Sequence, residues 1–101
     1  MFQLIEFIHV HGNNKSHNVK LYALSTCAFC KRALAFLKEN SIDFQYVFVD
    51  QLEKKIVGDL RDELKDKSGC RHVAYPFLIL DNDKFLVGFN EKEYKTFFNI
   101  E

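Results

Sequence analysis

The chain has 101 residues, of which 48% are hydrophobic and 28% charged, the proportions of an ordinary globular protein. This length predicts one domain covering residues 1–101, since a typical domain has ~100–150 residues. Fourteen Lys and Arg residues balance fourteen Asp and Glu residues, so the charge does not favour nucleic acid or an anionic membrane as a partner.

Neither a targeting signal nor a run of ~18 apolar residues is evident, so we expect a cytoplasmic location. Three cysteines do not suit a disulfide scaffold, because their number is odd and the chain is long enough to bury a core without staples. In a reducing compartment, two cysteines close together are typical of catalysis or metal binding.

The first half of the chain reads as two strands and a helix. Residues 2–10 roughly alternate in hydrophobicity, which predicts a strand, and a polar turn segment follows to residue 18. A short apolar run at residues 19–24 predicts a buried strand. Residues 28–39 predict a helix, because apolar side chains recur at helical spacing at Cys30, Ala33, Leu34 and Leu37.

The second half reads as a strand, a helix, a hairpin and a last helix. Residues 43–50 carry apolar groups on both faces, which suits an interior strand. Residues 51–67 predict an amphipathic helix, since apolar residues recur every four positions at Leu52, Ile56, Leu60 and Leu64. Two apolar runs, 77–80 and 84–89, flank a turn at residues 81–83 and predict a hairpin.

Asn90 can cap a last helix with Glu93 as its capping-box partner, and the buried face of that helix would carry Tyr94, Phe97 and Phe98. The order of elements, β, βαβ, α, ββα, predicts an α/β domain. Its mixed sheet would have parallel strands in the βαβ half, antiparallel strands in the hairpin, and helices on both faces.

The motif with the clearest chemistry is Cys27-Ala28-Phe29-Cys30, placed where a strand turns into a helix. A helix start presents unpaired N–H groups and a positive dipole end, so we expect a lowered pKa for the thiol of Cys27. Residues three apart on a helix lie ~5–6 Å from each other, within reach of a disulfide. Cys27 would therefore attack a disulfide, and the more buried Cys30 would resolve the mixed disulfide.

The residues around the motif leave alternatives open. Lys31 and Arg32 could add positive potential near the thiolate or be ordinary solvated residues. We expect Phe29 to face outward as an apolar contact for a partner.

A zinc site would need Cys70 and His72 as further ligands, but that spacing is poor for a closed tetrahedral site. His9 and His11 could share one strand face, although solvated polar positions explain them more simply. We therefore expect no metal site.

The segment VKLYALSTCAFCKR at residues 19–32 resembles the opening strand and active site of glutaredoxins, and the resemblance continues through YPFLI at 75–79 and VGFN at 87–90. It implies a thioredoxin fold of glutaredoxin type. In that fold residues 19–99 form a mixed four-stranded core sheet flanked by three helices, and residues 1–18 are an extension with an extra strand.

The resemblance also implies a thiol–disulfide oxidoreductase that reduces protein disulfides or glutathione mixed disulfides. No cofactor would be bound, and glutathione would be the co-substrate. Pro76 matches the family's cis-proline, so the backbone of Tyr75 would pair with a peptide or with glutathione like an added strand. The implied catalytic residues are Cys27 and Cys30, and the implied substrate-binding residues are Thr26, Phe29, Tyr75, Pro76, Gly88 and Phe89.

The sequence departs from the family pattern at three positions. Gly88-Phe89 replaces the usual Gly-Gly pair, the usual lysine upstream of Cys27 is missing, and Tyr75 stands where Val is common. Glutathione binding should therefore be weakened, with thioredoxin reductase as the alternative electron source. Lys31, Arg32 or Arg71 could replace the missing positive charge.

We expect the oxidoreductase to be a monomer. Two other functions stay open. One is an iron–sulfur or metal-binding relative, in which a dimer holds a cluster with the first cysteine and glutathione. The other is a redox-silent interaction module of thioredoxin fold. For Cys70, a free loop thiol without a role is the simplest interpretation.

Overall fold

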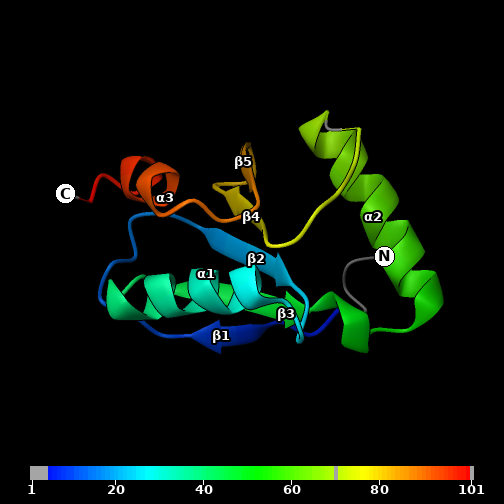
Figure 1. Ribbon diagram of the computed structural model, residues 1–101, viewed down its shortest axis with the longest axis horizontal. Coiled ribbons are helices and arrows are strands. Elements are labelled where there is room, and N and C mark those ends of the chain that lie inside the picture. The colour runs from blue at the N-terminus through cyan, green and yellow to red at the C-terminus, as the bar shows by residue number, and fades with distance from the viewer. Residues whose placement is uncertain (1–4, 70, 101) are drawn as a thin grey trace.

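The computed structural model describes residues 5–69 and 71–100 and contains one mixed sheet with helices on both of its faces (Figure 1). In chain order the elements are β1 (Ile8–Val10), β2 (Val19–Ala23), α1 (Ala28–Glu39), β3 (Phe44–Phe48), the 3₁₀ turn η2 (Val49–Gln51), α2 (Lys54–Ser68), β4 (Phe77–Leu80), β5 (Lys84–Val87) and α3 (Glu91–Phe97).

The five strands lie in the order β1-β3-β2-β4-β5. The central pair, β2 and β3, is parallel, and the other three pairs are antiparallel. The predicted core of four strands with one extra N-terminal strand is therefore confirmed. Because β1 covers the outer edge of β3, that strand lies inside the sheet, as its two apolar faces predicted.

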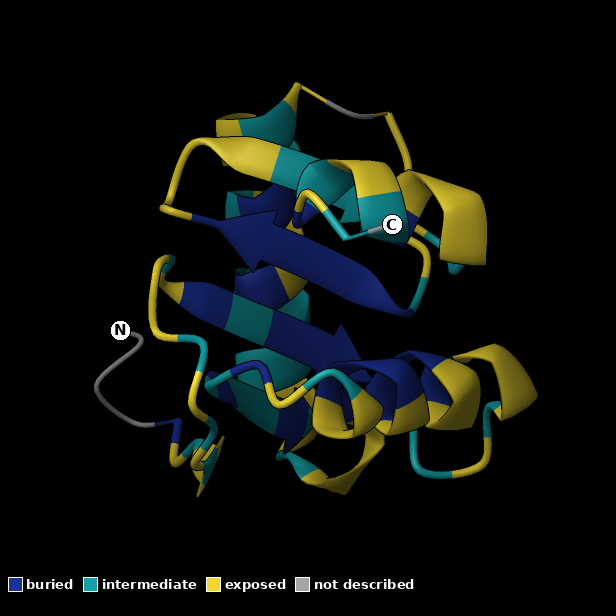
Figure 2. Cartoon of the chain, turned by 90° about the vertical axis from the view of Figure 1, so that its left-hand side faces the viewer, coloured by how far each residue is buried: buried dark blue, intermediate teal, exposed yellow. Residues whose placement is uncertain are grey.

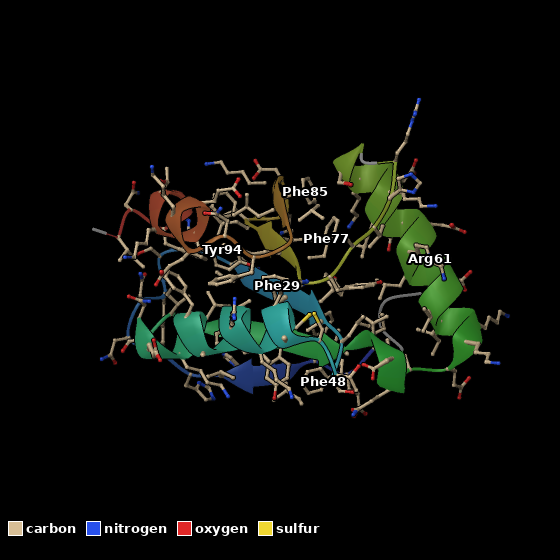
Figure 3. All side chains as sticks on the ribbon, viewed as in Figure 1. Phe29, Phe48, Arg61, Phe77, Phe85 and Tyr94 are labelled. Atoms are coloured by element: carbon tan, nitrogen blue, oxygen red, sulfur yellow. The ribbon has the colours of Figure 1, made fainter. Side chains whose placement is uncertain are left out.

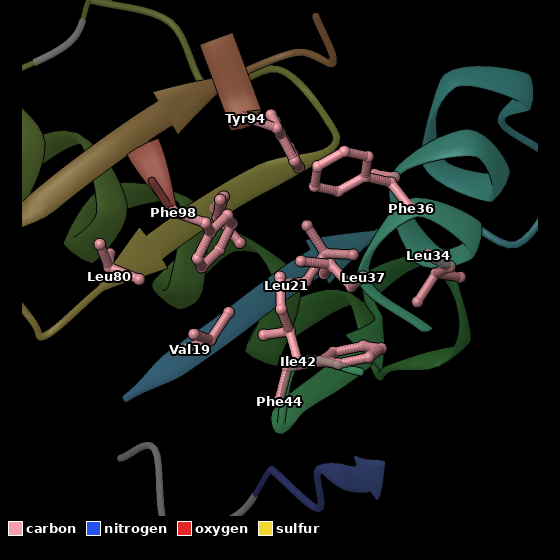
Figure 4. Close-up of a cluster of buried hydrophobic side chains, with 12 residues drawn as sticks. Val19, Leu21, Leu34, Phe36, Leu37, Ile42, Phe44, Leu80, Tyr94 and Phe98 are labelled. Carbon is pink, nitrogen blue, oxygen red and sulfur yellow. The ribbon is translucent and has the colours of Figure 1, made fainter. Parts of the chain in front are cut away.

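Alternation along the strands divides the core into two layers. Val19 and Leu21 of β2 face a cluster built by α1 and α3, which Figure 4 shows in close-up. Tyr22 of β2 faces the opposite cluster, where Leu60 and Leu64 of α2 pack on the sheet. The central strands are buried and the outer helix surfaces are exposed (Figure 2). Because β2 and β4 are antiparallel, with Tyr22 opposite Phe77, the β2–α1 turn and the segment before β4 lie at the same end of the sheet.

The first strand is shorter than the predicted 2–10. Residues 2–4 lie outside the described part of the chain, and pairing with β3 begins only at Ile8. Ile5 is buried in the α2-side cluster, and the Phe7 ring lies 5.7 Å from that of Tyr22. The chain therefore leaves the sheet edge before Ile8, because these two apolar side chains pack on the face of the sheet instead.

Three further boundaries differ from the sequence prediction by more than one residue. β3 ends at Phe48 instead of residue 50, because the 3₁₀ turn at Val49–Gln51 follows it directly. α2 begins at Lys54 instead of residue 51, because the 3₁₀ turn after β3 buries Val49, and Leu52 then packs on the core from outside the helix. β5 ends at Val87 instead of residue 89, because Gly88 has a φ of +82°. That left-handed conformation, which glycine adopts without strain, interrupts the strand.

The last helix begins as predicted. The side chain of Asn90 accepts a hydrogen bond from the N–H of Glu93 at 3.1 Å and caps α3. Tyr94 and Phe98 are buried on the α1 side of the sheet, and Phe97 packs against the same cluster. Among the described residues, no helix combines the length and apolar character needed to cross a bilayer.

Candidate active site

The turn between β2 and α1 places Cys27 at the N-cap of α1. Its backbone is extended, with φ −87° and ψ 122°, and its sulfur accepts a hydrogen bond from the N–H of Cys30 at 3.3 Å. Cys27 thus takes the place that a Ser or Asp usually fills at a helix start, and its sulfur lies against donors that the helix itself leaves unpaired.

The two thiols of the motif differ in exposure. Cys30 is completely buried, whereas Cys27 is partly exposed, and both are free thiols. The N–H of Leu24 points at the Cys30 sulfur from 3.4 Å, so the strand end and the first helical turn enclose that atom. The predicted difference in burial between the two cysteines is confirmed.

The pKa values of the two thiols shift in opposite directions. For Cys27, burial has the largest effect and raises the pKa. Hydrogen bonds from the Cys30 thiol and from the N–H groups of Cys30 and Phe29 outweigh it, and the pKa is lowered. For Cys30, burial is also the main cause, and with the hydrogen bond to Cys27 it raises the pKa to about 12. Cys27 is therefore the more easily ionised of the two thiols.

The segment before β4 lies directly beside Cys27. The Tyr75–Pro76 peptide bond is cis, as predicted, and Pro76 is buried. The Cys27 thiol points at the carbonyl oxygen of Tyr75 from 3.9 Å. A substrate sulfur bound at Cys27 would therefore lie next to main-chain groups of Tyr75, to which an extended peptide can hydrogen-bond like an added strand.

The Gly88 loop is tied to the same segment. The N–H of Gly88 donates to the carbonyl oxygen of Pro76 at 2.8 Å, and the Tyr94 hydroxyl lies 3.5 Å from the Gly88 carbonyl oxygen. Phe89 packs edge-on against Tyr94, with ring centroids 4.7 Å apart. The extra bulk of Phe89 is thus largely taken up by the α1-side cluster, which Phe89 joins as a partly buried side chain.

A groove of about 490 Å³ runs between α1 and this loop, lined by Phe29, Arg32, Phe36, Phe89, Glu91 and Lys92 among others. Phe29 is 54% exposed, which confirms the predicted outward orientation, and it stands at the start of α1 (Figure 3). The Arg32 guanidinium lies over its ring, 5.4 Å from the centroid. Arg32 is therefore held beside Phe29, whereas Lys31 is simply exposed.

A second groove, of about 510 Å³, opens on the α2 side and is lined by Leu24, Asp50, Arg61, Lys65, His72 and Tyr75 among others. Arg61 lies on α2, the helix that covers this face of the sheet (Figure 3). Neither Arg61 nor Lys65 was expected at the site, and Arg71, which was, does not line either groove. Arg61 and Lys65 are four residues apart, so both lie on one face of α2. The sequence alone could have indicated this pair of positive charges.

Asp50 and Ser25 support the turn that carries the motif. Asp50 accepts hydrogen bonds from both the N–H and the hydroxyl of Ser25, and these bonds lower its pKa. The negative charge of Asp50 contributes to the raised pKa of Cys30. Thr26, the next residue, is exposed. Cys70, and with it the Cys70–His72 pairing that zinc would need, lies outside the described residues.

Comparisons with known proteins agree with this geometry. The Glutaredoxin family model matches residues 19–83. A glutaredoxin structure from Methanosarcina mazei superposes with a TM-score of 0.79 at 33% identity, covering 95% of this chain and 90% of that one. Methanosarcina acetivorans methanoredoxin superposes with a TM-score of 0.72 at 32% identity, covering 84% of this chain and 86% of that one.

A curated relative of known sequence is an uncharacterized glutaredoxin-like 8.6 kDa protein of Clostridium pasteurianum. It is 27% identical over 75 residues, which are 74% of this chain and 89% of the relative. The fold that the family model and the solved structures share is the thioredoxin-like fold described above. Because the family model covers more than half of the chain and the two Methanosarcina structures cover 95% and 84% of it, the chain belongs to the glutaredoxin family.

Proposed function

We propose that this protein reduces disulfides in proteins, or mixed disulfides with glutathione, through dithiol exchange at Cys27 and Cys30. The observation that supports this most is the contrast between the two thiols. Cys27 is partly exposed with a lowered pKa, and Cys30 is buried with a pKa raised to about 12. An attacking thiol must be ionised and accessible, whereas a resolving thiol must be close and protected.

In the first step the Cys27 thiolate attacks one sulfur of the substrate disulfide. The substrate S–S bond breaks, its other sulfur leaves as a thiolate that takes up a proton, and Cys27 is left in a mixed disulfide. The N–H of Cys30, 3.3 Å from the Cys27 sulfur, stabilises the attacking thiolate before this step.

In the second step Cys30 loses its proton and attacks the Cys27 sulfur. The second substrate thiol is released, and the protein keeps a Cys27–Cys30 disulfide. The substrate has gained two electrons and two protons, and the dithiol has lost them. The charge on Cys27 is one cause of the raised pKa of Cys30. Forming the mixed disulfide removes that charge, so Cys30 becomes easier to ionise when it is needed.

Substrates would be held by the surfaces on either side of Cys27. The main chain of Tyr75 offers strand-like hydrogen bonds, the exposed ring of Phe29 offers an apolar contact, and Thr26, Pro76, Gly88 and Phe89 would complete the binding surface. The protein would act as a monomer without a bound cofactor. A cytoplasmic location suits this chemistry, because a reducing dithiol needs a reducing compartment.

Glutathione is the proposed co-substrate, with thioredoxin reductase as the alternative electron donor. Arg61 and Lys65 line the groove beside Tyr75 and could meet a glutathione carboxylate where the usual lysine is missing. The Gly88-Phe89 loop lacks the second glycine of the family pattern. We therefore propose that glutathione is used with moderate affinity.

The test is a disulfide-reduction assay with two donor systems side by side, glutathione with glutathione reductase and NADPH with thioredoxin reductase. We expect turnover that Cys27→Ser abolishes. Arg61→Ala should raise the apparent KM for glutathione by at least about tenfold, since a lost charge-assisted hydrogen bond is worth ~1.5–3 kcal/mol. Lys55→Ala, which replaces an exposed residue of the same helix, should leave the apparent KM for glutathione unchanged.

The outcomes separate the two parts of the proposal. No turnover with either donor, with both thiols remaining reduced, would contradict the oxidoreductase function. Tight saturation by glutathione together with no turnover from thioredoxin reductase would instead contradict the proposed choice of donors.

A further inference from the structure

A cluster of two imidazoles and a carboxylate lies at the outer edge of the sheet. His9 is in β1, His11 follows two residues later, and Asp43 directly precedes β3. The Nε2 atom of His9 lies 2.8 Å from Oδ2 of Asp43, and the rings of His9 and His11 have centroids 4.1 Å apart. One possible ligand atom from each residue lies within 4.8 Å of the other two.

The backbone around this cluster keeps Asp43 in place. The N–H of Gly12 donates to Oδ1 of Asp43 at 3.0 Å, so that the other carboxylate oxygen faces the imidazoles. A Cβ at Gly12 would overlap the backbone of Ser41 and Ile42. Glycine, which has no Cβ, therefore allows the two backbone segments to approach this closely. Asn14 continues the contact, since its carbonyl oxygen accepts from the N–H of Asp43 at 2.9 Å.

We propose that His9, His11 and Asp43 bind a divalent transition-metal ion of the zinc class. Imidazole nitrogen and carboxylate oxygen are ligands that zinc and its neighbours accept, with water completing the shell. Ligands at ~2.0–2.2 Å from a tetrahedral ion lie roughly 3.3–3.6 Å apart. The ion would replace the proton that His9 and Asp43 share, so the distance between Nε2 of His9 and Oδ2 of Asp43 would increase slightly. The exposed ring of His11 would rotate slightly toward the ion.

The electrostatics of the carboxylate suit a cation. The carboxylate oxygen Oδ2 of Asp43 faces the His9 ring at 2.8 Å and would supply the negative charge that a bound cation needs. Lys15 is a nearby positive charge. The same charge opposes a bound metal ion, so replacing Lys15 with Gln should not weaken binding.

This site is separate from the dithiol. Asp43 precedes β3, whereas Cys27 follows the opposite end of β2, which runs parallel to β3. In Figure 1, β1 points toward the C-terminal end of α1, while the motif lies at the N-terminal end of that helix. The ion would join the N-terminal extension to the sheet, a role beyond disulfide exchange.

The test is calorimetric titration of the full chain with zinc chloride. Cys27, Cys30 and Cys70 are replaced by Ser so that thiolates do not bind the metal. We expect one ion per chain and a raised melting temperature. His11→Ala should lower the affinity at least tenfold while keeping the His9–Asp43 hydrogen bond, so folding is preserved; circular dichroism checks this.

His17→Ala is the matched control. Its Nδ1 atom lies 2.7 Å from Oδ2 of Asp81, the same type of His–Asp pair, but among the described residues no third metal-binding side chain joins it. We expect this variant to bind zinc like its parent. No binding by the parent, unchanged affinity in His11→Ala, or an equal loss in His17→Ala would each overturn the proposal.

Discussion

The N–H of Cys30 donates a hydrogen bond to the sulfur of Cys27 at 3.3 Å, while the sulfur of Cys30 is itself completely buried. One residue therefore stabilises the thiolate of the other and is protected from reacting first. This relationship is the physical basis for assigning different roles to two cysteines that the sequence places only three positions apart.

Alkylation should distinguish the two thiols. Near neutral pH, Cys27 should react with iodoacetamide at least about tenfold faster than Cys30, because only the thiolate is nucleophilic. The pKa of Cys27 is lowered, and burial raises that of Cys30 to about 12. Mass-spectrometric footprinting of the reduced protein measures both rates, and equal rates would show that the proposed division of roles is wrong.

Removing the resolving thiol should trap the intermediate. Cys30→Ser should accumulate mixed disulfides between Cys27 and protein substrates, because the nearby thiol that would release them is gone. Non-reducing gels and mass spectrometry detect these adducts. Cys70→Ser is the control and should leave turnover largely intact. If Cys30→Ser turned over protein substrates at the normal rate, resolution would have to come from another thiol.

Phe29 should matter for protein substrates more than for stability. Phe29→Ser should lower kcat/KM for a protein disulfide several-fold, since its exposed ring lies at the start of α1 beside Cys27. Because Phe29 is 54% exposed, the free energy of unfolding should change by no more than about 0.5 kcal/mol. Ile8→Ser removes an equally exposed apolar side chain, 51% accessible, from the far sheet edge. An equal loss of activity in that control would argue against a contact role for Phe29.

The free energy of unfolding should fall in acid, because three aspartates with lowered pKa values become protonated. Hydrogen bonds from Ser25 lower the pKa of Asp50, those from His9 and Gly12 lower that of Asp43, and those from Asn18 and His17 lower that of Asp81. A carboxyl with a lowered folded-state pKa stabilises the fold above its unfolded value, near 3.8. That contribution is lost as the pH falls through the folded-state pKa, because the unfolded chain then binds more protons.

The measurement is the urea midpoint at pH 6 and at pH 3. Asp81→Asn should show a smaller drop between the two pH values than the parent protein. Asp83→Asn is the control, since the side chain of Asp83 makes no hydrogen bond to the described residues. If Asp81→Asn lost as much stability in acid as the parent, the lowered pKa of Asp81 would not contribute.

The sequence by itself was sufficient for the features that depend on neighbouring residues. The helix at residues 28–39 follows from apolar spacing, and its observed bounds, Ala28–Glu39, are the predicted ones. The cap of α3 by Asn90 follows from a side chain that reaches only three residues ahead. The adjacency of Cys27 and Cys30 likewise needs nothing more than one helical turn.

Only the tertiary structure decided the features that join distant parts of the chain. Tyr75 meets Cys27 across 48 residues, and Asp43 meets His9 across 34. Arg61 reaches the site because α2 packs on the face of the sheet beside Tyr75. β1 is short because Ile5 packs on the sheet face instead of pairing at its edge. Periodicity reports local hydrogen bonding and amphipathic faces, whereas these contacts depend on strand order and on which face each side chain packs against.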